Sequence, residues 1–377
     1  MCLLPDSAQD NPEVLEGLPR RSILCIMPPH ILRSIAERGT PEQRVAASQT
    51  LALDATFRML RASTLAFEGQ PVVIPAADAG SKRRTIYSAR HLQQLPGLLV
   101  ASEGDPPGAH ADVAVREAFD GLGATWDFFA DVFDRHSIDD EGMALDATVH
   151  YGDRYNNAFW NSRQMVFGDG DGQLFNRFTI AVDVIGHELT HGVTEDEAGL
   201  VYMFQSGALN ESVSDVFGSL IKQKLRRQTA READWLIGEG LFTPAVSGRA
   251  LRSMKAPGTA YSDPVIGHDP QPDHMSKYVN TYNDNGGVHI NSGIPNRAFQ
   301  LAADGLGGYA WEKAGRIWYE TLRDSALRPN TGFKRFAKLT VSTAGRLYGQ
   351  GSVEQEIVAD AWATVGLAVS AGLPAFR

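Results

Sequence analysis

The sequence predicts an α+β protein of two lobes with a cleft between them: a β-rich N-terminal lobe, a central helix with two histidines, and an α-helical C-terminal lobe. Three observations lead to this fold class. Short apolar runs separated by turns dominate from about 72 to 172, helical periodicity dominates from Leu200 onward, and a His-Glu-x-x-His pattern lies between the two regions. With 377 residues, 43% of them apolar, the chain can form a large core and more than one lobe.

The first 65 residues form a separate segment, followed by the β-rich lobe (66–195) and the helical lobe (196–377). The segment begins rich in proline and acidic residues, and from about 41 to 61 it predicts an amphipathic helix. The helical spacing is seen in Leu51, Ala55, Met59 and Ala62. The first residues lack the basic start and long apolar run of a secretory signal, so the residues alone leave the localisation open.

Strands of the β-rich lobe are predicted where short apolar runs lie between turn residues. These runs are 71–75, Arg84–Tyr87, Leu98–Val100 and Leu145–Tyr151. Between the last two, a long apolar stripe of helical period over Ala111–Phe133 predicts a core helix. Residues 155–160 and 164–167 predict a hairpin at a sheet edge, where an edge strand can hold an extended peptide through main-chain hydrogen bonds. We expect the following Gly168–Gly172 to be a tight turn rather than a calcium loop.

The helical lobe contains three well-bounded amphipathic helices, which we expect to be structural. They cover Ala310–Leu327, Gly332–Leu347 and Val353–Val369.

Composition excludes several classes of partner. The net charge of −10 and the acidic balance argue against nucleic acid, and no segment approaches the ~20 apolar residues of a membrane span. The two cysteines, Cys2 and Cys25, both fall in the first thirty residues, so the two later lobes contain no disulfide and the redox compartment stays open. We expect a monomer.

The central helix carries His187, Glu188 and His191, and this spacing predicts a metal centre. Histidines four residues apart leave the same face of a helix one turn apart, so both imidazoles can bind one zinc ion. Glu188 is rotated away from the metal axis, where its carboxylate can take a proton from a zinc-bound water whose pKa is near 7. Two exposed helical histidines are the alternative, but the largely apolar run Phe178–Ile185 predicts a buried helix.

Glu211 is the best candidate for a third zinc ligand. It lies in a helical pattern that opens after the turn-like Gln205–Gly207, and it shares a face with Asp215, four residues later. Asp215 could accept a hydrogen bond from the second nitrogen of a ligand histidine, as such histidines usually require. The alternative is a solvated acidic helix face.

The order of motifs resembles the thermolysin family of zinc endopeptidases. After YNNAFWN (155–161) and QMVFGDGDG (164–172) come GHELTHGVT (186–194), GLVY (199–202), SGALNESVSD (206–215), ALRSM (250–254) and DNGGVHINSG (284–293). The resemblance covers roughly Thr85 to the C-terminus. Near the start, Pro28-Pro29-His30-Ile31-Leu32 resembles the short propeptide of the protealysin-like branch.

The resemblance implies the precursor of a metalloendopeptidase that cuts proteins or peptides before large hydrophobic residues. Glu188 would be the general base, Tyr202 and His289 would stabilise the oxyanion, and Asp284 would orient His289. Asn157, Ala158 and Arg252 would bind the substrate backbone. The specificity pocket would be formed by Phe175, Phe178, Val184, Ile237 and Leu251. Core packing is an alternative for each of these five and for Tyr202, and a place at a helix start is the alternative for His289.

The resemblance also makes residues 1–65 a propeptide that covers the cleft and is later removed. Cys25 could then cap the zinc as a thiolate, although a lone cysteine is more often a small buried thiol. Related enzymes are often exported, which favours secretion.

Calcium is where the sequence departs from the family. Asp183, Asp234 and Glu239 match the acidic residues of a double calcium site, but Lys222 and Leu236 replace two glutamates. A lysine ammonium could replace one calcium ion electrostatically, and a hard cation needs six or more oxygen ligands. We therefore expect at most one calcium ion.

Two other functions stay open at this point. A zinc aminopeptidase would need a carboxylate for the free amine near Asn157 and Ala158, and none is evident in the sequence. A catalytically silent homologue with structural or absent zinc is the non-enzymatic alternative, although a structural site has no need of Glu188.

Overall fold

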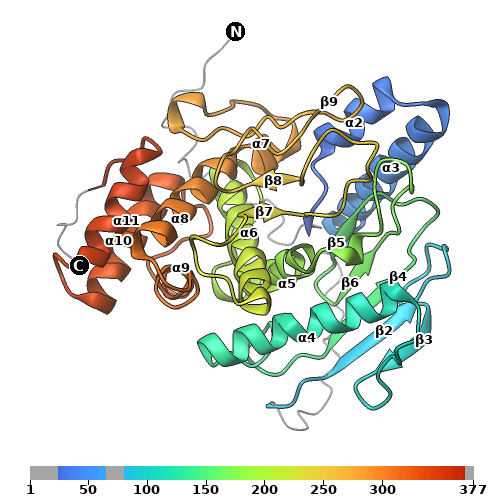
Figure 1. The fold of residues 1–377 in the computed structure, drawn as a ribbon, viewed down its shortest axis with the longest axis horizontal. Coiled ribbons are helices and arrows are strands. Elements are labelled where there is room, and N and C mark those ends of the chain that lie inside the picture. Colours follow the sequence, from blue (N-terminus) through green and yellow to red (C-terminus); the bar gives the residue numbers. More distant parts are fainter. Residues whose placement is uncertain (1–23, 65–79, 370–377) are drawn as a thin grey trace.

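The computed structural model in Figure 1 describes residues 24–64 and 80–369, with side chains for 25–56 and 80–369. The predicted strand at 71–75, Cys2 and the side chains of Met59 and Ala62 lie outside the described residues. The fold confirms the predicted α+β class: a mixed sheet on one side, two long helices in the middle and a helical layer on the other.

The β-rich lobe is built on a mixed sheet with the strand order β1-β5-β6-β4-β2-β3 among the described residues. The strands are β1 (Leu24–Cys25), β2 (Arg84–Ser88), β3 (Leu98–Ser102), β4 (Leu145–Val149), β5 (Ala158–Trp160) and β6 (Gln164–Phe167). β4 runs parallel to β2 and to β6, and the other pairs are antiparallel. The predicted hairpin is present as β5 and β6, but β5 is not a free edge, because β1 pairs with it.

Helix α4 (Val113–Phe133) lies along the sheet and confirms the predicted core helix. Asp112 begins it as an N-cap, with its side chain accepting hydrogen bonds from the backbone N–H groups of Ala114 and Val115. Four aromatic rings, Phe128, Phe129, Phe133 and Phe217, meet where α4 packs against the central helices.

Two central helices, α5 (Val182–Glu197) and α6 (Phe204–Arg226), pack against each other over most of their lengths. Glycines permit the close approach: a Cβ on Gly186 would lie 2.6 Å from Ile221 Cδ1, and one on Gly218 would lie 2.4 Å from the backbone oxygen of Asp183. Helix α6 begins at Phe204, so Gln205–Gly207, predicted as a turn, belongs to its first turn.

The C-terminal layer consists of α7 (Asp284–Asn291), α8 (Gly293–Leu306), α9 (Ala314–Leu322), α10 (Phe333–Tyr348) and α11 (Val353–Thr364). The three predicted helices are present as α9 to α11 with shorter or shifted ends. The expectation that the chain is mainly helical from Leu200 onward is wrong for 227–283, which is mostly loop. This stretch contains η3 (Met275–Lys277) and two short ribbons: β7 (Leu236–Ile237) with β8 (Arg252–Ser253), and β9 (Ser262–Asp263) with β10 (Gly267–His268).

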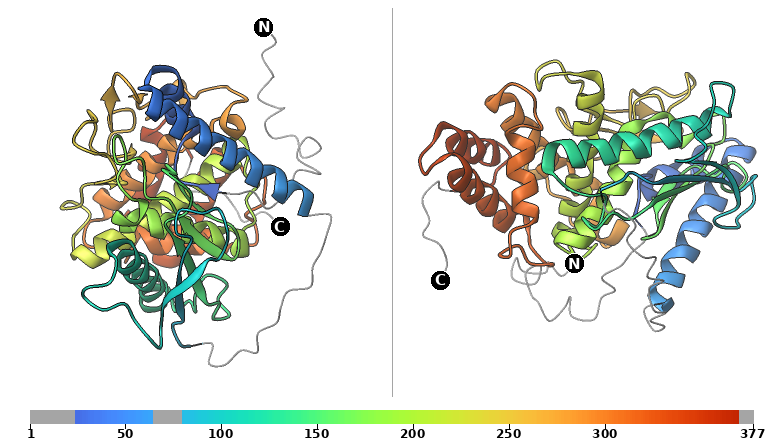
Figure 2. Two further views of the ribbon diagram at one scale, coloured as in Figure 1. Left: turned by 90° about the vertical axis from the view of Figure 1, so that its right-hand side faces the viewer. Right: turned by 90° about the horizontal axis from the view of Figure 1, so that it is seen from below.

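The N-terminal segment folds as β1 followed by α2 (Pro29–Arg38) and α3 (Pro41–Thr64), which pack together beside β5 (Figures 1 and 2). Two hydrogen bonds link α2 to the loops of the helical lobe: His30 Nε2 to Tyr261 Oη at 2.8 Å, and Ser34 Oγ to the carbonyl oxygen of Val265 at 2.8 Å. None of the described helices is long and apolar enough to cross a membrane.

We predict that Gly218→Ala destabilises the protein by about 1–3 kcal/mol or more, because the new methyl group would overlap the backbone of α5 and push the two central helices apart. Thermal or urea unfolding measures this change. Gly104→Ala is the matched control, because no atom beyond its two chain neighbours lies within 4 Å of the methyl group it adds. Equal stability of the two variants would contradict the close α5–α6 contact.

Candidate active site

The two central helices bring His187, His191 and Glu211 together in the interior. All three side chains are fully buried, and one ligand atom from each lies within 4.8 Å of the others. The two Nε2 atoms are 3.0 Å apart, and each lies 3.5 Å from an oxygen of Glu211. The structure therefore groups the three residues that the sequence predicts as zinc ligands.

Neighbouring groups fix which ring nitrogens face the centre. His187 Nδ1 lies 2.8 Å from Asp215 Oδ1, and His191 Nδ1 lies 2.7 Å from Asn210 Oδ1. Both partners are acceptors, so each neutral imidazole carries its proton on Nδ1 and turns the lone pair of Nε2 toward the other. Burial lowers the pKa of His187 to about 4 and that of His191 to about 3, which favours these neutral forms at pH 7.

The donor set fits a zinc ion. Two unprotonated imidazole nitrogens face each other, and Glu211 Oε2 is buried with no hydrogen-bond partner among the described residues. Converging lone pairs without a proton between them repel one another, and a cation bound to all three would remove that cost. Imidazole nitrogen and carboxylate oxygen are zinc ligands, and three of them leave a fourth position open.

Glu188 lies on α5 between the two histidines and is fully buried. Its Oε2 accepts a hydrogen bond from the backbone N–H of Trp160 at 3.1 Å, whereas Oε1 has no hydrogen-bond partner in the described part of the chain. Burial and the charge of Glu211 raise the pKa of Glu188 well above that of an ordinary glutamate, and the backbone N–H groups of Trp160 and Ile26 oppose this shift.

Tyr202 and His289 both lie next to Glu211 at the centre. The Tyr202 hydroxyl donates to Glu211 Oε1 and lies 3.3 Å from His289 Nε2. His289 Nδ1 lies 2.6 Å from Asp284 Oδ1. Burial alone would lower the pKa of His289, but the charges of Asp284 and Glu211 outweigh it and raise the pKa to about 9.

Asp215 connects a ligand histidine to Arg252. The Arg252 guanidinium donates from Nε to Asp215 Oδ2 and from Nη2 to Oδ1, both at 2.8 Å, and Asn296 Nδ2 donates to Oδ2 at 2.8 Å. These contacts hold the carboxylate that faces His187. Burial alone would raise the pKa of Asp215, but Arg252 and His187 outweigh it and depress that pKa.

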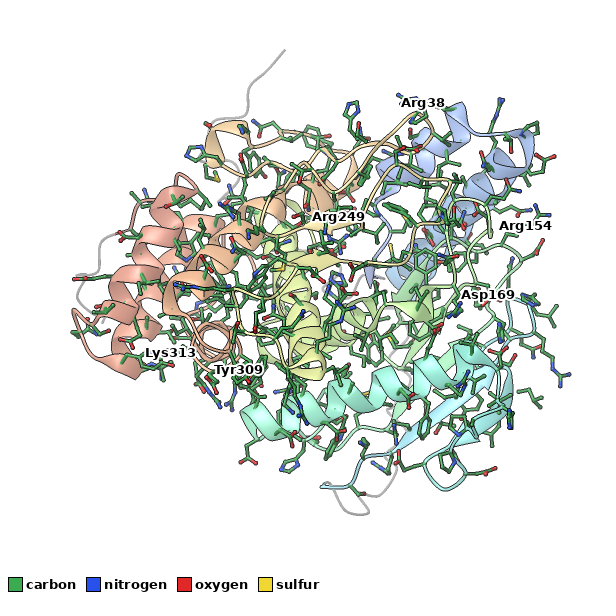
Figure 3. All side chains as sticks on the ribbon, viewed as in Figure 1. Arg38, Arg154, Asp169, Arg249, Tyr309 and Lys313 are labelled. Atoms are coloured by element: carbon green, nitrogen blue, oxygen red, sulfur yellow. The ribbon has the colours of Figure 1, made fainter. Side chains whose placement is uncertain are left out.

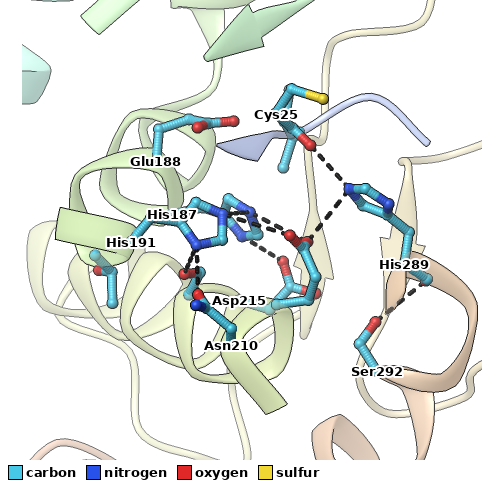
Figure 4. A network of polar contacts seen from close by, with 12 residues as sticks. Cys25, His187, Glu188, His191, Asn210, Asp215, His289 and Ser292 are labelled. Carbon is cyan, nitrogen blue, oxygen red and sulfur yellow. Dashed lines mark hydrogen bonds and ion pairs between the residues drawn. The ribbon is translucent and has the colours of Figure 1, made fainter. Parts of the chain in front are cut away.

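The segment Cys25–Met27 lies beside the centre: Cys25, the last residue of β1, is labelled in Figure 4, and Ile26 and Met27 form a bend that follows the strand. His289 Nε2 lies 2.9 Å from the Cys25 carbonyl oxygen. The Ile26 N–H donates to the carbonyl oxygen of Ala158 at 3.3 Å, and Arg252 Nη1 donates to the Ile26 carbonyl oxygen at 3.1 Å.

Next along the segment, the Met27 N–H donates to Asn157 Oδ1 at 3.1 Å. The residues expected to bind a substrate backbone thus bind the chain's own N-terminal segment.

Helix α3 contacts residues 155–157, which lead into β5. Asp54 is buried and accepts from Tyr155 Oη at 2.6 Å and from Asn157 Nδ2 at 2.9 Å. Thr50 Oγ1 accepts from the backbone N–H of Asn156 at 3.1 Å. The N-terminal segment therefore fixes the orientation of the Asn157 amide as well as occupying its oxygen.

The thiol of Cys25 is not part of the group of metal-ligand atoms among the described residues. Cys25 is buried in a small apolar cluster with Tyr151, Tyr155 and Phe159. This is the commoner of the two roles considered for it, and the backbone carbonyl is what reaches the centre.

The five residues expected in a specificity pocket are all buried in the main apolar core, which also contains Ile26 and Met27. They are Phe175, Phe178, Val184, Ile237 and Leu251. All five residues therefore pack in the core, and their place in a specificity pocket stays a prediction.

Lys222 occupies the centre of the expected calcium site. Its Nζ lies 2.9 Å from Asp183 Oδ2, 2.9 Å from Asp234 Oδ1 and 2.6 Å from the carbonyl oxygen of Leu236, and the lysine is buried. Glu239 lies outside this group and pairs with Arg226 at 3.2 Å.

The turn Gly168–Gly172 is closed by Asp171, whose Oδ1 accepts hydrogen bonds from the backbone N–H groups of residues 173 to 175. This is the side-chain geometry of a tight turn.

Sequence reasoning missed four supporting residues: Asn210 and Ser214, which contact His191 Nδ1, and Asn296 and Asp54. A signal existed for the first two. Asn210 and Ser214 precede Glu211 and Asp215 by one residue each, and a ligand histidine requires a partner for its second nitrogen.

Comparisons with known proteins agree with this geometry. The model of the thermolysin metallopeptidase catalytic domain matches residues 74–195, and that of the thermolysin metallopeptidase α-helical domain matches residues 198–367. An extracellular metalloprotease of Pectobacterium carotovorum subsp. carotovorum is 53% identical over 349 residues, covering 93% of this chain and 98% of that protein. Protease PrtS of Photorhabdus sp. (strain Az29) is 48% identical over 352 residues, covering 91% and 92%.

A solved structure, the precursor of protealysin, a metalloproteinase from Serratia proteamaculans, superposes with a TM-score of 0.83 at 53% identity. The match covers 92% of this chain and 100% of that one.

We predict that Lys222→Met destabilises the protein by about 3–5 kcal/mol, because it leaves Asp183 and Asp234 buried beside each other without a cation. Chemical denaturation measures the loss. Lys224→Met is the matched control: Lys224 pairs with the exposed Asp131, and such pairs contribute about 1 kcal/mol or less. A loss no larger than that of the control would show that the Lys222 ammonium does not hold this group together.

Proposed function

The chain belongs to the thermolysin family of metallopeptidases and is the precursor of a zinc metalloendopeptidase; on this premise, we propose how its residues share the work. One observation carries the proposal. The buried ligand atoms of His187, His191 and Glu211 converge beside the Glu188 carboxylate, and the backbone of Cys25–Met27 contacts the residues around them. When bound by the three ligands, zinc would supply a Lewis acid that polarises a carbonyl group and activates a water molecule.

Glu188 acts as the general base. Its carboxylate takes a proton from the attacking water and passes it to the nitrogen of the departing amine. A raised pKa suits this double role, because a carboxylate of higher pKa is the stronger base and can still release the proton afterward. The place of Glu188 on α5, between the two histidines of the metal centre, supports this assignment.

His289 and Tyr202 stabilise the negative charge that develops on the former carbonyl oxygen. The support is the 2.9 Å contact of His289 Nε2 with the Cys25 carbonyl oxygen, made by a ring whose other nitrogen faces Asp284. A fixed donor of this kind typically lowers the barrier by about 3–4 kcal/mol.

The substrate backbone takes the place that Cys25–Met27 occupies in the precursor, with Asn157, Ala158 and Arg252 as its partners. In this alignment the Cys25–Ile26 peptide bond lies where the bond to be cut would lie, and Ile26 follows it. A buried aliphatic residue at this position supports a preference for large hydrophobic residues after the cut. Phe175, Phe178, Val184, Ile237 and Leu251 form the pocket in this proposal.

Residues 1–65 act as an inhibitory propeptide. They cover β5 with β1 and bind the Asn157 amide through Asp54, so a substrate cannot add to that strand while they remain in place. We also propose that the enzyme acts outside the cell, as the name of the Pectobacterium relative says of that protein. Because Lys222 fills the position between Asp183 and Asp234, at most one calcium ion binds there.

The deciding experiment compares the zinc-loaded full-length chain with its Glu188→Ala variant. N-terminal shortening is followed by mass over time, and cleavage of a peptide with a central Phe or Leu is followed in parallel. We expect the wild type to shorten and to cut before the hydrophobic residue, with a chelator abolishing both. The variant should do neither, although it retains one zinc equivalent by elemental analysis. Peptide cleavage by the variant at the wild-type rate would exclude Glu188 as the base.

We predict that Asp54→Ala increases the peptidase activity of the uncut precursor by about 10-fold or more. The substitution removes a charged acceptor from two hydrogen bonds, each contributing about 1.5–3 kcal/mol, so the segment leaves the cleft more often. Initial rates on a short peptide, taken before any shortening appears by mass, measure the effect. Glu42→Ala, on the exposed face of the same helix, should leave the rate unchanged. An Asp54→Ala rate equal to wild type would show that α3 does not restrain the cleft.

A further inference from the structure

A second group of metal-ligand side chains lies on the surface of the β-rich lobe: His91, His150 and Asp169. One potential ligand atom from each lies within 4.8 Å of the others. Asp169 Oδ2 is 2.9 Å from His150 Nδ1 and 3.5 Å from His91 Nδ1. The residues follow β2, β4 and β6, and Asp169 is labelled in Figure 3, at the end of the molecule away from the helical lobe. None of them takes part in the catalytic proposal.

His150 is oriented as a metal ligand usually is. Its Nδ1 faces Asp169, and its Nε2 lies 3.3 Å from Oδ1 of Asp112, the residue that caps α4. Ligand histidines commonly donate the N–H of the second nitrogen to a carboxylate, which fixes the ring and leaves the first nitrogen free to bind. The proton on Nε2 would then belong to the Asp112 contact, and the Nδ1 lone pair would point into the group.

The local charge suits a divalent cation. The Arg177 guanidinium interacts electrostatically with Asp112 and Asp169, but it is paired with Glu117 at 2.5 and 2.7 Å. That pair is neutral overall, and the ion-pair partners of Asp112 and Asp169 among the described residues are the two imidazoles. A doubly charged ion would balance the two carboxylates.

The backbone holds both histidines in place. His91 and His150 have φ values of 62° and 55°, in the left-handed region that non-glycine residues rarely adopt, and the His91 N–H donates to the His150 carbonyl oxygen at 2.8 Å. Such conformations persist where surrounding structure fixes them, and they are concentrated at functional sites.

We propose that His91, His150 and Asp169 bind a second transition-metal ion of the zinc type, with Asp112 orienting His150 and water completing the coordination. Two imidazoles and a carboxylate are a ligand set that zinc and its neighbours accept. Ligands of a tetrahedral zinc ion lie roughly 3.3 Å apart, given metal–ligand distances near 2.0 Å. The His91 side chain is 60% exposed and can close the remaining distance.

The ion would stabilise the strand that binds substrate. Gly168 and Gly170, on either side of Asp169, donate backbone hydrogen bonds to the carbonyl oxygens of Asn157 (3.0 Å) and Tyr155 (3.2 Å). An ion at Asp169 would therefore tie three loops to the start of β5. Its effect would be on stability, independent of the chemistry at His187 and His191.

The test uses the full-length Glu188→Ala chain, which does not process itself in the proposed mechanism, loaded first with one zinc equivalent. Zinc is then titrated while bound metal and the thermal midpoint are recorded. We expect a second equivalent to bind and the midpoint to rise. Both effects should disappear in His91→Ala and in Asp169→Asn. His110→Ala, which removes an exposed histidine outside the group, should behave as the unchanged background.

Two results would overturn the proposal. The first is that the Glu188→Ala chain binds a single zinc equivalent in total, in which case Asp112 and Asp169 hold a protonated His150 instead of a metal. The second is a further equivalent that survives both His91→Ala and Asp169→Asn, which would place that ion elsewhere. His91→Ala guards against a folding artefact, because this exposed side chain can be truncated without opening the core.

Discussion

The rest of the structure depends on the contact between α5 and α6, which places unprotonated donor atoms in the interior. His187 and His191 face each other through lone pairs, and Glu211 adds a carboxylate oxygen without a hydrogen-bond partner among the described residues. Such a group is unfavourable in a dry interior unless a cation binds it. The helices can approach closely enough only because Gly186 of α5 leaves room for the Ile221 side chain of α6, and Gly218 of α6 leaves room for the backbone of α5. Helix packing and metal affinity are thus one property of this fold.

Around this centre, buried charges are balanced in pairs. Arg252 and Asp215 form a buried ion pair that also reaches His187, so the group that meets a peptide carbonyl shares a carboxylate with a metal-ligand histidine. Lys222 balances Asp183 and Asp234 at the far end of α6 in the same manner. Buried pairs of this kind contribute little net stability but make removal of either partner costly. They therefore restrict how α5 and α6 can move relative to each other.

The sequence predicted those features that rest on local spacing. The four-residue interval of His187 and His191, repeated by Glu211 and Asp215, was enough to predict two ligand-bearing helices, and the α4 stripe was equally clear. Features that depend on pairing between distant segments were not predictable from periodicity: the covering of β5 by β1, the loop-rich stretch 227–283, and the contact of Asp54 with Asn157. Spacing could not reveal the surface group of His91, His150 and Asp169 either, because the intervals between these residues follow no helical or strand period. The three side chains meet only because the strand order of the sheet brings the ends of β2, β4 and β6 together.

The pairing of β1 with β5 has a consequence for how the precursor responds to its surroundings. Because β1 belongs to the same chain as β5, its effective concentration at that strand is set by the length of the connecting chain and not by the amount of protein in solution. Dilution of the precursor would not weaken this contact. After a single cut in the connection, the same hydrogen bonds become bimolecular and their occupancy falls with concentration. The covalent link, more than the strength of the individual contacts, then determines when the cleft is open.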